Sequence, residues 1–416
     1  METNWAGNYA YRARALHQPS TLEQLQELVS SRPRLRVLGS RHSFSDIADS
    51  DELVSLDRIP GQIVVNRDAM RVSLGGAVRY GELIEELDRH GLALANLASL
   101  PHIAVAGAVS TATHGSGDRN CNLAAAVAGL QIVGSDGNVL TTTRGDPDFD
   151  GLVIGLGAVG ALTRITLDVE PVYRVRQRVF EGLRWNALLE HFDAIFASGY
   201  SVSVFSRWGD TTEQVWVKTR VGRAPEEPPA ELFGATAATR HRHPIVGLDP
   251  NHATPQLGLP GPWSERLPHF RSGFTPSSGA ELQSEYILPR RHAVAAVEAM
   301  LRIRERVAPL TQVSEIRTVA ADRLWMSPQY GQDTAAIHFT WKPRQAAVER
   351  ALVEVERALL PFEARPHWGK LFLARAEEIA PLYERRDDFA ALLARLDRRG
   401  AFRNEWLKQH VLGDDD

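Results

Sequence analysis

The chain has a single cysteine, Cys121, among its 416 residues. One cysteine excludes an intramolecular disulfide and is compatible with a reducing compartment. The sequence also has no run of 18 apolar residues, so we expect no transmembrane helix. Its first residues lack the basic start and apolar stretch of a signal peptide. Together these absences predict a cytoplasmic protein.

An excess of charge of one sign is also missing. The sequence has 47 Lys and Arg against 51 Asp and Glu, a net charge of −4, and no long basic run. Neither a nucleic acid nor a membrane surface is therefore expected as a partner.

A metal site has little support either, because His241-Arg-His243 has no cysteine, carboxylate cluster or helical histidine spacing around it. The length exceeds one ordinary core and predicts two or three domains.

The first informative stretch is Val37-Leu-Gly-Ser-Arg-His-Ser-Phe-Ser45. Residues 34–38 are typical of a short strand, which Gly39 and Ser40 then break. Glycine lets backbone approach a ligand closely, and free N–H groups in such a turn hold an anion. The loop is neither a Walker loop nor Gly-x-Gly-x-x-Gly. An ordinary turn with a solvent-exposed His42 explains these residues equally well.

Residues 98–117 form a second unusual stretch, because they are almost all small. They include Gly107, Gly115 and Gly117 and many Ala, Ser and Thr residues. Such a segment indicates backbone packed closely against a large flat ligand, with many N–H and hydroxyl donors. The alternative is a small-residue helix face that packs against another element.

The first half of the chain predicts alternating helices and strands. A capping box at residues 20–23 precedes an apolar-periodic helix, and a second helix begins near Tyr80. Hairpins are expected over residues 62–74 and 130–143, and residues 162–169 alternate as a strand. This half is therefore expected to be α+β.

The pattern changes near residue 173 and becomes dominated by strands. Residues 173–180, 201–206 and 214–219 alternate polar and apolar side chains. Residues 224–229 and 247–262 are rich in proline or glycine and predict long loops. We expect a second domain built on a sheet, followed by helices over residues 291–307 and 345–360 and a helical tail.

Three later strands carry charge where a core strand would be apolar. Glu315 and Arg317 are two residues apart and share one strand face, and His338 and Thr340 do the same. Lys370 follows a third strand. For a single strand, a solvent-facing polar alternation is the commoner explanation. The whole set points to a site, because these polar residues lie on strands rich in Ile, Val, Phe and Trp and partly buried charges need partners.

With these segments in hand, the chain resembles the vanillyl-alcohol-oxidase superfamily of flavoproteins, and within it the alditol (xylitol) oxidases. The resemblance runs along the whole chain. Its most specific segments are Leu100-Pro-His-Ile-Ala-Val-Ala-Gly107, Thr113-His-Gly-Ser-Gly117, Thr275-Pro-Ser-Ser-Gly-Ala-Glu-Leu-Gln-Ser-Glu-Tyr286, Glu315-Ile-Arg-Thr-Val-Ala-Ala-Asp322, His338-Phe-Thr-Trp341 and Pro366-His-Trp-Gly-Lys370.

The resemblance implies an α+β, two-domain PCMH-type FAD-binding fold. Residues 1–172 would form the FAD-binding domain. Residues 173–367 would form an inserted substrate domain on a mainly antiparallel sheet flanked by helices. Residues 368–416 would return to the FAD domain.

FAD is the implied cofactor, attached covalently through His42. Arg41 departs from the family pattern, since many relatives have glycine there, and its guanidinium could pair with phosphate. The other residues implied to bind FAD are Gly39, Ser40, Arg41, Ser43, Phe44, Ala98, Ser99, His102, Val105, Gly107, Thr111, Thr113, His114, Gly117, Val159, Gly160, Ile165, His367 and Lys370.

The implied reaction is oxidation of the terminal primary hydroxyl of an alditol such as xylitol or sorbitol to the aldose. Hydride would pass to flavin N5, and oxygen would reoxidise the flavin to give hydrogen peroxide. Arg317 and Lys370 would stabilise the developing negative charge. Glu315, Ser99, His338 and Thr340 would hold the hydroxyls. His338 is the first candidate for the base, because an unperturbed imidazole titrates near neutral pH.

Three other functions compete with this one. A sugar-1,4-lactone oxidase or dehydrogenase would share the fold and the His-Trp-Gly-Lys segment. Ala98 bears on the choice between oxidase and dehydrogenase, since the small residue beside the flavin can gate oxygen in this superfamily. A non-enzymatic flavin-binding protein would not need Glu315, Arg317 and Lys370. A nicotinamide enzyme lacks support without Gly-x-Gly-x-x-Gly. Polyol and oxygen are the expected partners, and the family suggests a monomer.

Overall fold

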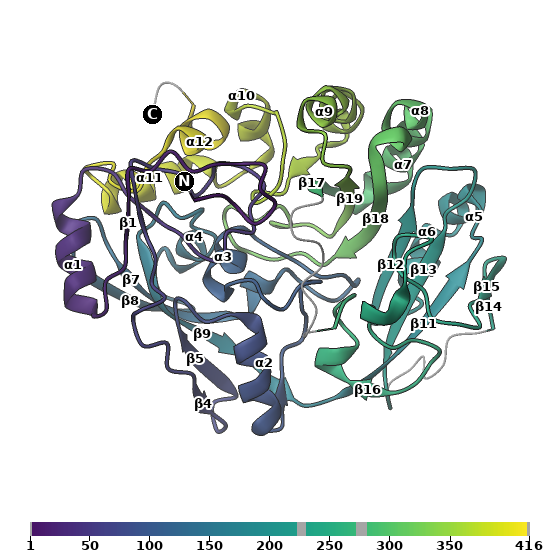
Figure 1. The fold of residues 1–416 in the computed structure, drawn as a ribbon, viewed down its shortest axis with the longest axis horizontal. Helices are drawn as coiled ribbons and strands as arrows, with labels where there is room; N and C mark the ends of the chain where they lie inside the picture. Colours follow the sequence, from purple (N-terminus) through teal and green to yellow (C-terminus); the bar gives the residue numbers. More distant parts are fainter. Residues whose placement is uncertain (1, 223–229, 272–280, 414–416) are drawn as a thin grey trace.

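The structure is a computed structural model that describes residues 2–222, 230–271 and 281–413 (Figure 1). The predicted loop over residues 224–229 and residues 275–280 of the Thr275–Tyr286 segment lie outside the described residues. The strands are β1 (Ala15–His17), β2 (Arg36–Val37), β3 (Glu52–Val54), β4 (Val64–Asn66), β5 (Arg71–Gly75), β6 (Leu92–Ala93), β7 (Val127–Val133), β8 (Val139–Thr143), β9 (Ala161–Asp168), β10 (Glu170–Pro171), β11 (Arg174–Glu181), β12 (Ser201–Ser206), β13 (Gln214–Arg220), β14 (Glu231–Leu232), β15 (Ala235–Ala237), β16 (Gly261–Pro262), β17 (Leu282–Pro289), β18 (Thr311–Val319), β19 (Thr334–Trp341) and β20 (Arg365–Pro366). The α-helices are α1 (Leu22–Ser31), α2 (Tyr80–Arg89), α3 (Val105–Ser110), α4 (Phe149–Val153), α5 (Trp185–Glu190), α6 (Phe192–Phe196), α7 (Ala293–Arg302), α8 (Arg304–Val307), α9 (Gln345–Leu359), α10 (Ala376–Ile379), α11 (Arg386–Leu396) and α12 (Glu405–Leu407).

The described part of the N-terminal half contains two larger sheets besides the short antiparallel pair β10-β6. One is antiparallel with the order β4-β5-β9-β7-β8, and the other is a small parallel sheet with the order β1-β3-β2. Both predicted hairpins are therefore confirmed, as is the strand after residue 160. Asp136-Gly137 turns the second hairpin, with Gly137 at φ +82°.

The predicted capping box of α1 is wrong by one residue. Thr21 is the N-cap and accepts a hydrogen bond from the Gln24 amide, and the Gln24 side chain accepts from the Ser20 amide. The pattern also fits Ser20 with Glu23, since either residue can cap a helix that buries Leu25 and Val29.

A large antiparallel sheet dominates the rest of the molecule. Its strand order is β14-β15-β11-β13-β12-β18-β19-β17-β20, with β16 paired to β11. Figure 1 shows α5 to α9 along the outer side of this sheet, away from the N-terminal sheets. On α9, Val348, Leu352 and Val355 are fully buried, as expected for an amphipathic helix covering a sheet.

The predicted helix over residues 291–307 is interrupted. It starts with a 3₁₀ turn, continues as α7 and α8, and breaks at Ile303, whose ψ is near 5°. Periodicity alone missed this break, because apolar residues recur on both sides of it.

The C-terminal segment returns to the N-terminal half, where α11 and α12 lie beside the start of the chain (Figure 1). The Leu35 amide donates to the Ala401 carbonyl at 2.8 Å, and the Arg399 guanidinium donates to the Val29 carbonyl at 3.0 Å. The proposed domain boundaries at residues 172 and 367 remain a prediction. Within the described ranges, no helix combines the length and hydropathy that a membrane span requires.

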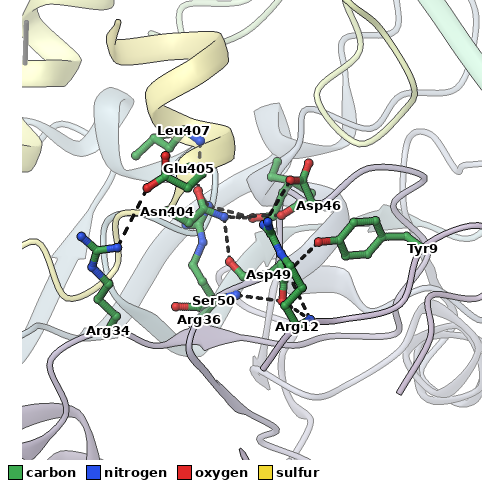
Figure 2. A network of polar contacts seen from close by, with 11 residues as sticks. Tyr9, Arg12, Arg34, Arg36, Asp46, Asp49, Ser50, Asn404, Glu405 and Leu407 are labelled. Atoms are coloured by element: carbon green, nitrogen blue, oxygen red, sulfur yellow. Dashed lines mark hydrogen bonds and ion pairs between the residues drawn. The ribbon is translucent and has the colours of Figure 1, made fainter. Parts of the chain in front are cut away.

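Asn404 anchors this returning segment (Figure 2). Its amide nitrogen donates to the carbonyl oxygens of Ile47 and Asp49 at 3.0 and 2.9 Å. Its amide oxygen caps α12 by accepting from the Leu407 amide and also accepts from the buried Arg36 guanidinium at 3.1 Å. One side chain therefore joins the end of the chain to the first parallel sheet and the loop after it.

Candidate active site

A cavity of about 610 Å³ is lined by both the N-terminal half and the large sheet. It brings together most of the residues singled out in the sequence. Those on its wall are Gly39, Ser40, Arg41, His42, Ser43, Phe44, Ala98, Ser99, Gly107, Thr111, Thr113, His114, Gly160, Glu315, Arg317, His338, Thr340, His367 and Lys370.

Five residues that the resemblance assigned to FAD do not line this cavity: His102, Val105, Gly117, Val159 and Ile165. The three apolar residues are buried and belong to the hydrophobic core. Gly117 has a packing reason of its own: at φ +131°, a Cβ would lie 2.3 Å from the Tyr200 carbonyl oxygen. Their assignment to the cofactor stays a prediction.

His42 is held with one ring nitrogen unused. Its Nδ1 donates to the Ser40 carbonyl at 2.9 Å, since a carbonyl oxygen only accepts. Its Nε2 is buried and has no hydrogen-bond partner in the structure. Burial, and secondly His102, lower the pKa of His42 to about 4. A neutral imidazole with a free lone pair therefore stands on the cavity wall.

The N-terminal segment packs directly over His42. The Trp5 ring stacks on the imidazole with centroids 5.2 Å apart, and the Trp5 amide donates to the Arg41 carbonyl at 2.8 Å. Arg41 itself has φ 63°, a conformation that favours glycine. Its guanidinium forms an ion pair with Glu2, so a phosphate contact would have to compete with that carboxylate.

The opposite wall comes from three neighbouring strands of the large sheet. The register pairs His338 of β19 with Glu285 of β17 on one side and with Glu315 of β18 on the other. Arg317 is two residues further along β18, on the same face. The cross-strand pairing therefore places all four side chains in one patch facing the cavity.

Glu285 is the centre of this patch. One carboxylate oxygen accepts from the Arg317 guanidinium, and the other accepts from Lys370 Nζ at 2.7 Å. Burial alone would raise the pKa of Glu285, but Arg317, Lys370 and the nearby His114 lower it well below its usual range. The carboxylate is thus ionised and holds two cations at the cavity.

Glu285 also lies near two histidines, His114 and His367, and one ligand atom of each of the three lies within 4.8 Å of the others. His114 Nε2 is 3.4 Å from a Glu285 oxygen. This spacing would suit a metal ion, but both Glu285 oxygens already bind Arg317 and Lys370. Two adjacent positive charges oppose a further cation, so the cluster is better explained as an ion-pair network.

Sequence reasoning missed Glu285, Gln283 and His269, which all line the cavity. A signal existed for the first two, since Gln283 and Glu285 are polar residues two apart on an otherwise apolar strand. The same rule selected Glu315 and Arg317. His269 gave no such signal, because it lies in an irregular segment after β16. Only the tertiary structure places it at the site.

The cavity suits a flavin dinucleotide. His42 presents a buried nitrogen that has no hydrogen-bond partner among the described residues. At Gly107 on α3, a Cβ would meet no atom within 4 Å, so this face of the small-residue stretch opens onto the cavity. Part of the predicted small-residue stretch is thus a helix, and that helix forms the cavity wall rather than a packing face alone.

Comparisons with known proteins bear on the fold and on the class of cofactor. A family model described as FAD binding domain matches residues 13–143, and a model described as D-arabinono-1,4-lactone oxidase matches residues 280–410. Among solved structures, a cholesterol oxidase from B. sterolicum superposes with a TM-score of 0.79 at 15% identity, covering 98% of this chain and 96% of that one. The expected α+β, PCMH-type fold is confirmed, and fold and site define an FAD-binding oxidoreductase.

Sequence relatives narrow this class. An alditol oxidase from Streptomyces sp. (strain IKD472 / FERM P-14339) is 46% identical over 416 residues, covering 99% of both chains. An L-gulono-1,4-lactone dehydrogenase from Mycobacterium tuberculosis (strain ATCC 25618 / H37Rv) is 27% identical, also covering 99% of both. The chain belongs to the alditol oxidase family.

Proposed function

We propose that this protein oxidises the terminal primary hydroxyl of alditols such as xylitol and sorbitol to the aldose. The observation that carries this proposal is the pair of cations, Arg317 and Lys370, that Glu285 holds on the wall of the cavity that His42 also lines. FAD bound here would supply the hydride acceptor and the redox chemistry that converts oxygen to hydrogen peroxide.

Arg317 and Lys370 favour negative charge at the reacting oxygen, because they are cations in a water-poor cavity. Glu315, Thr340 and Ser99 line the same space and bind the remaining hydroxyls of the substrate. An acyclic polyol is thereby held with its terminal carbon in one orientation, which lowers the entropic part of the barrier.

The geometry counts against His338 as the base. Burial and the neighbouring Lys370 lower the pKa of His338 well below its ordinary value. Its Nε2 contacts the Gln283 amide oxygen at 3.2 Å, so Nε2 carries the proton and Nδ1 is the free acceptor. We propose that His338 orients a substrate hydroxyl. The proton of the reacting hydroxyl is accepted by solvent.

Covalent attachment of FAD through His42 is part of the proposal. Forming the bond replaces one hydrogen of the flavin 8α-methyl group with an imidazole nitrogen. The two protons released go to solvent, and the two electrons go to oxygen. The unpartnered, neutral imidazole supports this role. His42→Ala should leave a protein whose flavin is released on acid precipitation; flavin that stays with the pellet would refute the attachment site.

A sugar-1,4-lactone is the second candidate substrate, favoured by the match of residues 280–410 to the lactone oxidase model. Anaerobic mixing with xylitol or L-gulono-1,4-lactone, followed by air, separates the two. Bleaching of the flavin absorbance by xylitol and fast recovery in air with peroxide supports the alditol oxidase. Bleaching by the lactone alone supports the second candidate. Slow recovery in air would indicate a dehydrogenase.

The monomeric state and the cytoplasmic location also remain proposals. The monomeric state rests on the family resemblance. Size-exclusion chromatography with light scattering tests the first.

A further inference from the structure

His269 bridges two predicted substrate-binding residues that come from different halves of the molecule. Its Nδ1 lies 3.0 Å from Ser99 Oγ, and its Nε2 lies 3.6 Å from a carboxylate oxygen of Glu315. The imidazole is 6% exposed and lines the cavity. Neither the resemblance nor the proposed mechanism gives it a role.

The position of the ring is fixed from several sides. Phe205 and Trp216 present ring edges to the imidazole, at centroid distances of 5.3 and 5.5 Å and angles of 76° and 88°. Two residues earlier, the Leu267 carbonyl accepts a hydrogen bond from the buried Lys218 at 2.5 Å. A ring held this firmly can set the orientation of the groups that it contacts.

The surroundings also decide where the imidazole carries its proton. Burial, then Lys218 and Arg317, lower the pKa of His269 well below its ordinary value, so the ring is neutral with one N–H. The carboxylate of Glu315 faces Nε2 and attracts that N–H. Nδ1 is then an acceptor, and the Ser99 hydroxyl donates its proton to it.

This arrangement has a consequence for the cavity. When the Ser99 proton points at His269, only oxygen lone pairs of Ser99 face the cavity. The Glu315 oxygen nearest His269 is buried and has no hydrogen-bond partner among the residues that the structure describes. Both groups are acceptors, which suits hydroxyl donors and disfavours a carbonyl oxygen.

We propose that His269 is a positioning residue that holds Ser99 and Glu315 as acceptors for substrate hydroxyl groups. It thereby favours polyhydroxylated substrates over those presenting a carbonyl at this point. This inference rests on the proposed alditol oxidation. It predicts an effect on affinity for the polyol rather than on hydride transfer.

The test compares two amide substitutions of His269. In His269→Asn the amide oxygen can occupy the place of Nδ1 and accept from Ser99. In His269→Gln the amide reaches the place of Nε2 and leaves Ser99 without its acceptor. We expect KM for xylitol to rise about 3- to 10-fold in His269→Gln, with kcat within about twofold, and to stay near the wild-type value in His269→Asn.

Ser99→Ala provides the coupling control. If His269 acts through Ser99, His269→Gln should raise KM much less in the Ser99→Ala background than in the wild type. Equal KM changes in both backgrounds would overturn the proposal, as would an unchanged KM in His269→Gln. A rise of KM in His269→Asn as large as in His269→Gln would do the same, because it would indicate a purely structural role.

A second readout does not depend on turnover. With ¹⁵N-histidine labelling, the two ring nitrogens of His269 report the tautomer, and the signals that vanish in His269→Asn identify the residue. We expect the proton on Nε2 and a shift of the Nδ1 signal in Ser99→Ala. A proton on Nδ1 would overturn the inference even if a variant failed to fold. Wild-type protein whose flavin no alditol reduces would refute the proposed function instead, leaving the tautomer result intact.

Discussion

Lys370 Nζ lies 2.7 Å from one carboxylate oxygen of Glu285, while the Arg317 guanidinium binds the other oxygen. The acid stands on β17, Arg317 on β18, and Lys370 in the turn after β20. The ion pairs therefore fix the position of a turn residue relative to two strands. Without Glu285, two buried cations would repel each other and move apart.

Glu285→Gln should disable the site although the substituted side chain has nearly the same volume. We expect the rate of flavin reduction by xylitol to fall about 100-fold or more, because the two cations lose their common partner. We also expect the free energy of unfolding to fall by about 3 kcal/mol, as for other buried pairs that lose one member. Stopped-flow absorbance and urea unfolding measure the two effects. Glu298→Gln, an exposed change on α7, is the matched control.

Ala98 lines the cavity and is expected to tune the reaction with oxygen. The family resemblance implies that Ala98 lies beside the flavin, where a larger side chain would narrow the space open to oxygen. Ala98→Val should slow reoxidation by oxygen about 10-fold or more, and Ala98→Gly should not slow it. Mixing reduced protein with oxygenated buffer gives both rates. Equal rates in the two variants would remove Ala98 as the gate.

Arg41 combines a left-handed backbone with an ion pair to Glu2. Arg41→Gly relieves the backbone strain but loses that pair, so we expect the free energy of unfolding to change by less than about 1 kcal/mol. Arg41→Val keeps the strain, adds a β-branched side chain and loses the pair, and should cost about 1–2 kcal/mol. Urea denaturation of the two variants tests this order. A valine variant as stable as the glycine variant would contradict the backbone geometry.

His114 should make the free energy of unfolding depend on pH in the acidic range. Burial lowers the pKa of His114 to about 4, whereas an unfolded histidine has a pKa of about 6.5. Between these values the unfolded state binds more protons, so stability is full above pH 6.5 and is lost as the pH falls toward 4. His114→Gln should flatten this slope by up to about 1.4 kcal/mol per pH unit. Unfolding at pH 7 and pH 5 measures it, with exposed His241→Gln as the control.

Asn404 holds the returning C-terminal segment against the first half of the chain (Figure 2). Asn404→Ala removes the α12 cap, the hydrogen bonds to three backbone carbonyls and the contact with Arg36. We expect a loss of about 2–4 kcal/mol in the free energy of unfolding. Asn138→Ala, at an exposed hairpin, should cost far less. Similar losses in both variants would show that the C-terminal anchor lies elsewhere.

Local pattern was enough to predict much of the scaffold. The hairpins, the strands over residues 201–206 and 214–219, and the helix over residues 345–360 follow from alternation and helical periodicity, which depend on near neighbours. The choice of Thr21 over Ser20 as a cap and the break at Ile303 were missed, because adjacent residues offer nearly equal local solutions.

The sequence by itself determined that small residues line one wall of the site and that Glu315 and Arg317 share a strand face. Only the tertiary structure decided which charges meet. The register of β17, β18 and β19 places Glu285, His338 and Glu315 side by side in one row. Lys370 follows Glu285 by 85 residues and contacts it only because the chain folds back to the same sheet. Ser99 and His269 are 170 residues apart. Such contacts depend on how distant strands pair, which local propensity does not encode.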